Sequence, residues 1–206
     1  MTDPARERRP ATYQDILDLP EHLVGEILDG ELIVSPRPAP PHVSASSVLG
    51  GELNSRYQRR TGGPGGPGGW WILDEPELHL GHSVMVPDLG GWRRERMVAL
   101  PGTAWFELAP DWVCEVVSPS SGRLDRVRKL PKYARAGVPH LWLVDPLQQT
   151  LEAYRLDGER WLLLGTWGGE DVVRVEPFDA TELELERWWE TGPPPEPAGP
   201  PAGGER

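Results

Sequence analysis

The sequence predicts an α/β or α+β fold in which helices flank a mixed β-sheet, with an additional β-hairpin near each end. Short apolar runs typical of strands alternate with segments that have helical spacing. Residues 112–145 form a strand–helix–strand unit, whose two strands should run parallel because the helix carries the chain back across the sheet. The hairpins add antiparallel neighbours, so the sheet is expected to be mixed.

The first half of the chain is expected to form five elements: a helix at 12–19, a hairpin at 23–35, a helix at 42–60, and single strands at 70–80 and 83–89. Thr12 can cap the first helix. Asp29 and Gly30 are a strong turn signal for the hairpin. Gly50 and Gly51 weaken the second helix without excluding it.

The second half is expected to form a strand at 111–118, a helix at 122–137, a strand at 140–145 and a hairpin at 150–167. Gly137 suits the end of the helix. Asp157 and Gly158 mark the predicted turn of the hairpin. The helix of this half should cover the sheet face on which Glu115 lies.

The 206 residues suit one folded domain, expected at residues 12–190, with a flexible Gly- and Pro-rich loop at 61–69. Residues 1–11 are expected to be flexible, and the Pro- and Gly-rich residues 191–206 to be a disordered tail. No segment has the length and hydrophobicity of a membrane span, and the N-terminus lacks a secretory pattern. With Cys114 as the single cysteine, these features predict a soluble, cytoplasmic protein without an internal disulfide.

The charge of the chain is unevenly distributed. The net charge is −11, and residues 145–206 hold 14 acidic but only 5 basic residues. This balance argues against non-specific binding of nucleic acid by the whole surface. Residues 123–135, with six basic residues and one acid, leave room for a local basic site.

Glu115 and Asp88 are the candidate metal-binding acids. Glu115 interrupts a hydrophobic strand near its carboxyl end, where a buried carboxylate needs a partner. Asp88 follows Pro87 and is expected to end a neighbouring strand. Two such carboxylates form a hard-oxygen site suited to Mg²⁺ or Mn²⁺. The alternatives are a turn or helix-cap role for Asp88 and a buried arginine partner for Glu115.

The chain has 19 arginines and only two lysines, Lys129 and Lys132, both on the helix after Glu115. A compact ammonium beside metal-bound carboxylates can stabilise charge that develops on a phosphate. The alternatives are a surface ion pair of Lys129 with Asp125 and a solvated helix face for Lys132.

These motifs together resemble the Uma-two family, within the restriction-endonuclease-like superfamily named for its PD-(D/E)-x-K motif. The resemblance covers roughly residues 12–185. It rests on "GEILDGELIVSPRPAPPHV", on the PD pair, on Glu115 followed by "SPS", and on the patterns D-x-x-x-K-x-x-x-Y and GV-x-x-x-W-L-V-D. It implies a restriction-endonuclease-like core, with Asp88, Glu115 and the backbone carbonyl of Val116 as metal ligands.

The superfamily lysine would stand two residues after Glu115, where this chain has Val117. The resemblance places the lysine on the following helix instead, at Lys129, with Asp125 and Tyr133 at the other fixed positions. Pro131 should kink this helix. Lys132, one turn on, is the substitute candidate.

Glu26 and His42 also match family positions. By resemblance Glu26 supplies a third acid to the catalytic cleft, and His42 contacts a metal-bound water or a phosphate. The alternatives are a solvent-facing hairpin residue for Glu26 and a helix-start residue for His42.

The sequence therefore favours a Mg²⁺- or Mn²⁺-dependent endonuclease that acts on DNA, with Asp88, Glu115, Lys129 and Glu26 as catalytic residues. Two alternatives remain: an inactive nuclease fold that binds nucleic acid or serves as a scaffold, and a hydrolase of smaller phosphate esters. A homodimer is expected because two strands must be cut and Trp and Val clusters look exposed.

Overall fold

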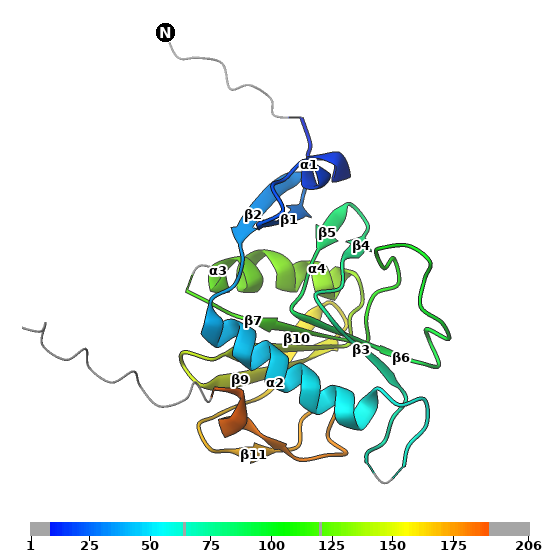
Figure 1. Ribbon diagram of the computed structural model, residues 1–206, viewed down its shortest axis with the longest axis vertical. Helices are drawn as coiled ribbons and strands as arrows, with labels where there is room; N and C mark the ends of the chain where they lie inside the picture. Colours follow the sequence, from blue (N-terminus) through cyan, green and yellow to red (C-terminus); the bar gives the residue numbers. More distant parts are fainter. Residues whose placement is uncertain (1–8, 64, 120, 190–206) are drawn as a thin grey trace, which may run out of the picture.

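The computed structural model describes residues 9–63, 65–119 and 121–189 (Figure 1). The predicted tail, residues 191–206, and most of the predicted flexible N-terminus lie outside these ranges. Among the described residues, no helix is both long enough and apolar enough to cross a lipid bilayer.

A six-stranded sheet forms the centre of the fold, in the spatial order β10-β9-β8-β7-β6-β3. Only β7 and β8 pair in parallel, and every other neighbouring pair in this sheet is antiparallel, which confirms the predicted mixed sheet. Its strands are β3 (Trp70–Asp74), β6 (Leu89–Arg93), β7 (Trp112–Val116), β8 (His140–Asp145), β9 (Thr150–Asp157) and β10 (Arg160–Gly168).

Two smaller sheets accompany it: β2-β1-β5-β4, and the pair β11-β12. Their strands are β1 (Leu23–Leu28), β2 (Glu31–Pro36), β4 (Leu78–Leu80), β5 (Ser83–Met85), β11 (Val172–Val173) and β12 (Leu183–Glu184).

Both predicted hairpins form. Asp29 and Gly30 have φ angles of 55° and 75°, as the two central residues of a type I′ turn require. In the second hairpin Asp157 pairs with Arg160, so the two-residue turn lies one residue later than predicted. Gly158 takes its first central position with φ of 60°.

The two single strands expected at 70–80 and 83–89 are each divided in the structure. The first separates into β3 and β4, which belong to different sheets, at Glu75 (φ 43°) and Pro76, which has no N–H for a strand ladder. The second separates at Val86 and Pro87 into β5 and β6 for the same reason. Asp88 therefore precedes β6 and does not end a strand, so that prediction was wrong.

The helices are α1 (Tyr13–Leu17), α2 (Pro40–Tyr57), α3 (Gly122–Leu124), the π-helical turn η1 (Asp125–Lys129), α4 (Leu130–Arg135) and the 3₁₀ turn η2 (Leu185–Trp188). All three predicted helices are present. The π turn lies just before Pro131, in the helix that was expected to kink. Leu130 N–H donates to the carbonyl of Asp125, five residues earlier, and Pro131 has no N–H to continue an α-helical ladder.

The six-stranded sheet lies between two helical layers, with α2 on one face and the continuous α3–η1–α4 segment on the other (Figure 1). Along β7, Cys114 and Val116 pack in the core beneath α2, whereas Val113 and Val117 pack in the core beneath α3–η1–α4. Glu115 alternates with Cys114 and Val116, so its side chain belongs to the α3–η1–α4 face.

Candidate functional site

Lys129 is the centre of a buried charge cluster. Its Nζ lies 2.7 Å from Glu115 Oε1, 3.0 Å from Glu26 Oε1 and 4.0 Å from Asp125 Oδ1. The three carboxylates come from β7, β1 and the π turn, so elements far apart in sequence converge on one ammonium. Lys129 and Asp125 are each only 3% exposed, which excludes the surface ion pair considered as an alternative.

Hydrogen bonds fix the carboxylates around the lysine. Tyr133 Oη donates to Glu115 Oε1 over 2.6 Å, and the backbone N–H of Val86 donates to Glu26 Oε1 over 2.8 Å. Lys129 Nζ also donates to the Val86 carbonyl at 3.4 Å. The helix thus sends a lysine and a tyrosine to the same carboxylate. Glu26 is buried, so the solvent-facing alternative for it is wrong.

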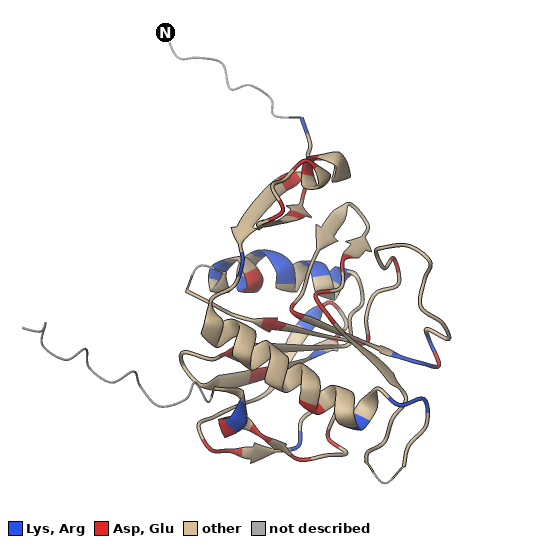
Figure 2. Ribbon diagram, in the orientation of Figure 1, with Lys and Arg blue, Asp and Glu red and all other residues tan. Residues whose placement is uncertain are grey.

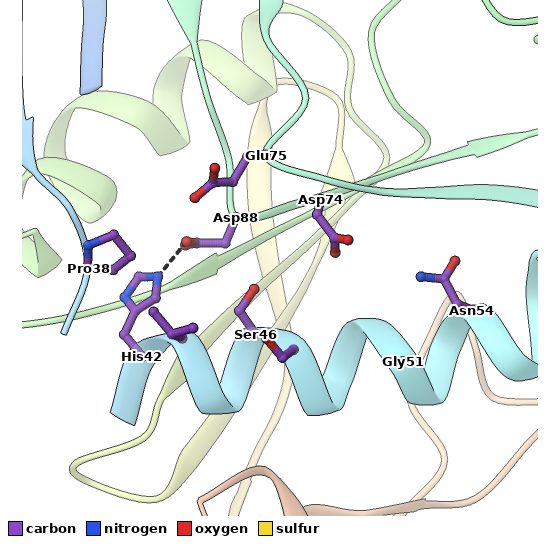
Figure 3. Close-up of a pocket in the computed structure, with 10 residues that line it drawn as sticks. Pro38, His42, Ser46, Gly51, Asn54, Asp74, Glu75 and Asp88 are labelled. Atoms are coloured by element: carbon purple, nitrogen blue, oxygen red, sulfur yellow. Dashed lines mark hydrogen bonds and ion pairs between the residues drawn. The ribbon is translucent and has the colours of Figure 1, made fainter. Parts of the chain in front are cut away.

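Asp88 lies beside this cluster. Because β6 and β7 are antiparallel, the start of β6 adjoins the end of β7, and Asp88 Oδ2 accepts the backbone N–H of Val116 over 2.7 Å. Its Oδ1 lies 2.5 Å from Nε2 of His42, in the first turn of α2 (Figure 3). The two acids predicted as a pair therefore lie at adjoining ends of β6 and β7, with Asp88 directly before β6 and Glu115 within β7.

Burial and mutual repulsion perturb the ionisation of the cluster. Burial raises the pKa of Glu115 well above its ordinary value, and the charges of Asp125, Asp88 and Glu26 add to this effect, while Lys129 opposes it. Burial lowers the pKa of Lys129, but the surrounding carboxylates outweigh this and hold it well above its ordinary value. The cluster therefore sets three carboxyl groups against one ammonium, and burial and mutual repulsion oppose the full ionisation of Glu115.

Lys132 does not join this cluster. Its Nζ lies 2.5 Å from Asp29 Oδ1, at the turn of the first hairpin. Its side chain is 7% exposed, so the solvated helix face considered for it is wrong as well. Of the two lysines, the structure brings Lys129 to Glu115.

A cavity of about 390 Å³ adjoins Asp88 (Figure 3). Asp74 and Glu75 also line it, and neither was predicted as a site residue. The signal available in the sequence was the acidic pair directly before Pro76, at the end of an apolar strand. The cavity runs along one face of α2, past Ser46 to Asn54.

The chemistry of the donors suits a hard divalent cation. Asp88 and Glu115 supply carboxylate oxygens at the adjoining ends of β6 and β7, with further carboxyl groups close by. In the described part of the chain, no group of three or more His, Cys, Asp or Glu side chains is arranged to hold a metal ion. Mg²⁺ commonly needs only one or two protein carboxylates, with water and substrate phosphates as its other ligands.

A mixed sheet between two helical layers, with acids at the adjoining ends of two neighbouring strands and a lysine beside them, defines a restriction-endonuclease-like α+β protein. Residues 11–186 match the model of the Uma2 family, described as "Putative restriction endonuclease", and the chain belongs to this family. The solved structures include a "putative nuclease belonging to DUF820" from Anabaena variabilis, with a TM-score of 0.70 and 22% identity over 87% of this chain and 98% of that one. Comparison with the curated proteins finds no match.

Proposed function

We propose that this protein is a cytoplasmic, Mg²⁺- or Mn²⁺-dependent endonuclease that hydrolyses phosphodiester bonds of DNA. The observation that carries the proposal is the 2.7 Å contact between Lys129 Nζ and Glu115 Oε1. It supports the assignment of the motif lysine to the helix, in place of the buried Val117 directly after β7. Membership of the family supports nuclease chemistry in general.

In this proposal Asp88, Glu115 and the carbonyl of Val116 hold the metal ion. When bound, the ion polarises a phosphodiester and lowers the pKa of a bound water. The hydrogen bond from the Val116 N–H orients Asp88. His42 holds the other oxygen of Asp88 and faces the same cavity, where it can contact a phosphate.

In this proposal Lys129 supplies the positively charged group that acts on the phosphate. Its ammonium stabilises the charge that develops on the phosphate in the transition state. Glu26 and the Val86 carbonyl hold its Nζ in place, so Glu26 acts on the reaction through Lys129. Tyr133 fixes the rotamer of Glu115 through its hydroxyl.

Nicking of supercoiled plasmid with Mg²⁺ or Mn²⁺ tests the proposal. We expect cleavage by the wild type, none in EDTA, and a loss of at least about 100-fold in Asp88→Asn, Glu115→Gln and Lys129→Gln. Asp29→Asn, which removes a surface carboxylate paired with Lys132, is the matched control and should cut normally. Cleavage that persists in Asp88→Asn would show that these residues do not carry the reaction.

One observation favours a second function, a DNA-binding protein of the same fold without catalysis. Lys129 and Glu115 are both buried and neutralise each other in part, as in a structural ion pair. On this alternative the wild type binds DNA but never nicks plasmid, with any divalent metal. The plasmid assay and a DNA-binding assay together separate the two functions.

We further propose a homodimer, since cutting both DNA strands requires two sites. Leu162 and Leu163 support it, because they are about half exposed on β10, one of the two edge strands of the six-stranded sheet. An edge strand with exposed apolar side chains is a surface on which a second copy can pair.

A further inference from the structure

Four arginines gather where α2 ends, and we call them the arginine cluster: Arg59, Arg60, Arg93 and Arg94. Arg59 and Arg60 follow α2, whereas Arg93 and Arg94 stand at the end of β6 (Figure 2). Gly69 joins the two segments. Its N–H donates to the Arg59 carbonyl over 2.7 Å, and its own carbonyl accepts the Arg94 N–H over 2.9 Å.

The cluster lacks acidic partners. Among the described residues, none of its four side chains lies within 4.0 Å of a carboxylate oxygen, whereas Arg126 and Arg128 on the helix after Glu115 form close ion pairs with glutamates. Arg59, Arg60 and Arg93 are exposed to solvent. The four guanidinium groups therefore have no close ion-pair partner in the described part of the chain, although the net charge of the whole chain is −11.

Arg94 is held rigidly within the cluster. Its guanidinium lies 3.4 Å from the centre of the Trp71 ring, and it donates to the carbonyls of Trp70 at 2.9 Å and Gln58 at 2.5 Å. Burial lowers the pKa of Arg94, and the positive charge of Arg60 lowers it further. Like charges held together in this way repel each other, and a bound polyanion would relieve that repulsion.

The cavity beside Asp88 leads toward the cluster. Apart from Val43, the α2 residues that line it, from His42 to Asn54, are small or polar (Figure 3). At a rise of about 1.5 Å per residue, His42 lies about 22 Å from Tyr57, the last residue of α2, and Arg59 follows two residues later. This length matches about seven base pairs of DNA at 3.4 Å each.

We propose that the arginine cluster binds backbone phosphates of duplex DNA about seven base pairs from the phosphodiester at Asp88. The inference rests on the proposed function, since it takes DNA as the substrate. Its physical basis is the unpaired charge of the cluster, its preformed geometry and the cavity along α2 that points from Asp88 toward it. It predicts sequence-independent affinity, because phosphates carry no base information.

The test measures DNA binding without catalysis. Fluorescence anisotropy of a labelled duplex of about 20 base pairs is recorded in EDTA, with KCl from about 50 to 200 mM. Arg59→Ala/Arg60→Ala should bind more weakly, and its slope of log affinity against log salt should fall in magnitude by about two, since each phosphate contact contributes about 0.9. Arg59→Lys/Arg60→Lys keeps the charge and should keep the slope.

The matched control is Arg160→Ala/Arg187→Ala, which removes two exposed arginines elsewhere. Equal affinity and slope in Arg59→Ala/Arg60→Ala and the wild type would overturn the inference, and so would an equal loss in the control. Loss of binding confined to the cluster variant supports it even if the wild type never nicks plasmid. In that case the proposed catalysis fails while the binding surface stands.

Discussion

At the scale of single residues, Lys129 brings to Glu115 the positive charge that a valine at position 117 cannot supply. A lysine at position 117 would reach Glu115 along the strand, but this chain has a buried valine there. The ammonium reaches Glu115 from the opposite helix, where Tyr133 and Asp125 also point into the cluster. If one charged side chain is removed from such a buried cluster, the charges of the remaining side chains are left without a partner.

This arrangement predicts different costs for the two lysines. Lys129→Met should lower the free energy of unfolding by about 3–5 kcal/mol, because Glu115 and Glu26 lose their buried cation. Lys132→Met, the matched control, should cost about 1 kcal/mol or less, because its partner Asp29 is 63% exposed. Urea denaturation of both variants measures the difference, and equal losses would contradict the buried role of Lys129.

Only some residues of the candidate site could be predicted from the sequence. Glu115 and Lys129 stand out in the sequence because Glu115 interrupts a hydrophobic strand and Lys129 is one of only two lysines beside 19 arginines, while Asp88 stands out as part of the PD pair. Asp74 and Glu75 were missed, because an acidic pair before a proline suits an ordinary loop as well as a site at the end of a strand. The burial of Lys132 depends on the position of Asp29, which only the packing of the hairpin against the helix determines.

At the scale of elements, hairpins and crossovers were predictable, while interruptions of strands were not. The Asp29–Gly30 turn is encoded locally by residues that tolerate positive φ. The division of residues 70–80 between two sheets depends on Glu75 and on partners far away in sequence. Asp88 reaches the Val116 N–H of β7 because β6 runs antiparallel to β7, a pairing that its local sequence does not specify.

The prediction about the proposed homodimer concerns β10, an edge strand of the six-stranded sheet. Leu162→Lys/Leu163→Lys should shift a dimer toward monomer, because charges on an edge strand oppose pairing with another chain. Sedimentation velocity over a range of concentrations measures the change. Val98→Lys, at a side chain that is 76% exposed elsewhere, is the control. A wild type that sediments as a monomer at every concentration would refute the dimer.

At the scale of the whole molecule, all four tyrosines have raised pKa values in the folded state. Burial is the largest cause for Tyr13, Tyr57, Tyr133 and Tyr154, and for Tyr154 it combines with a hydrogen bond to Glu152 to raise the pKa to about 12. The folded chain therefore binds more protons than the unfolded chain above about pH 10. The raised tyrosine pKa values therefore contribute their full stabilisation of the fold below about pH 10. This contribution is lost as the pH rises through the pKa values of the folded state.

Absorbance titration of the phenolate band tests this prediction. The curve of the native protein should lie at higher pH than the curve in concentrated urea, and alkaline unfolding should make it steep. Tyr154→Phe should remove the component near pH 12. Superimposable native and unfolded curves would contradict it.

The most direct test of the proposed site is calorimetric titration of Mn²⁺ into the wild type, Asp88→Asn, Glu115→Gln and the control Asp29→Asn. Since Asp88 and Glu115 would contribute ligands to one ion, we expect saturable binding near one ion per chain in the wild type and the control. Neither site variant should bind measurably. Absence of binding by the wild type, or equal binding by all four proteins, would contradict a metal site at Asp88 and Glu115.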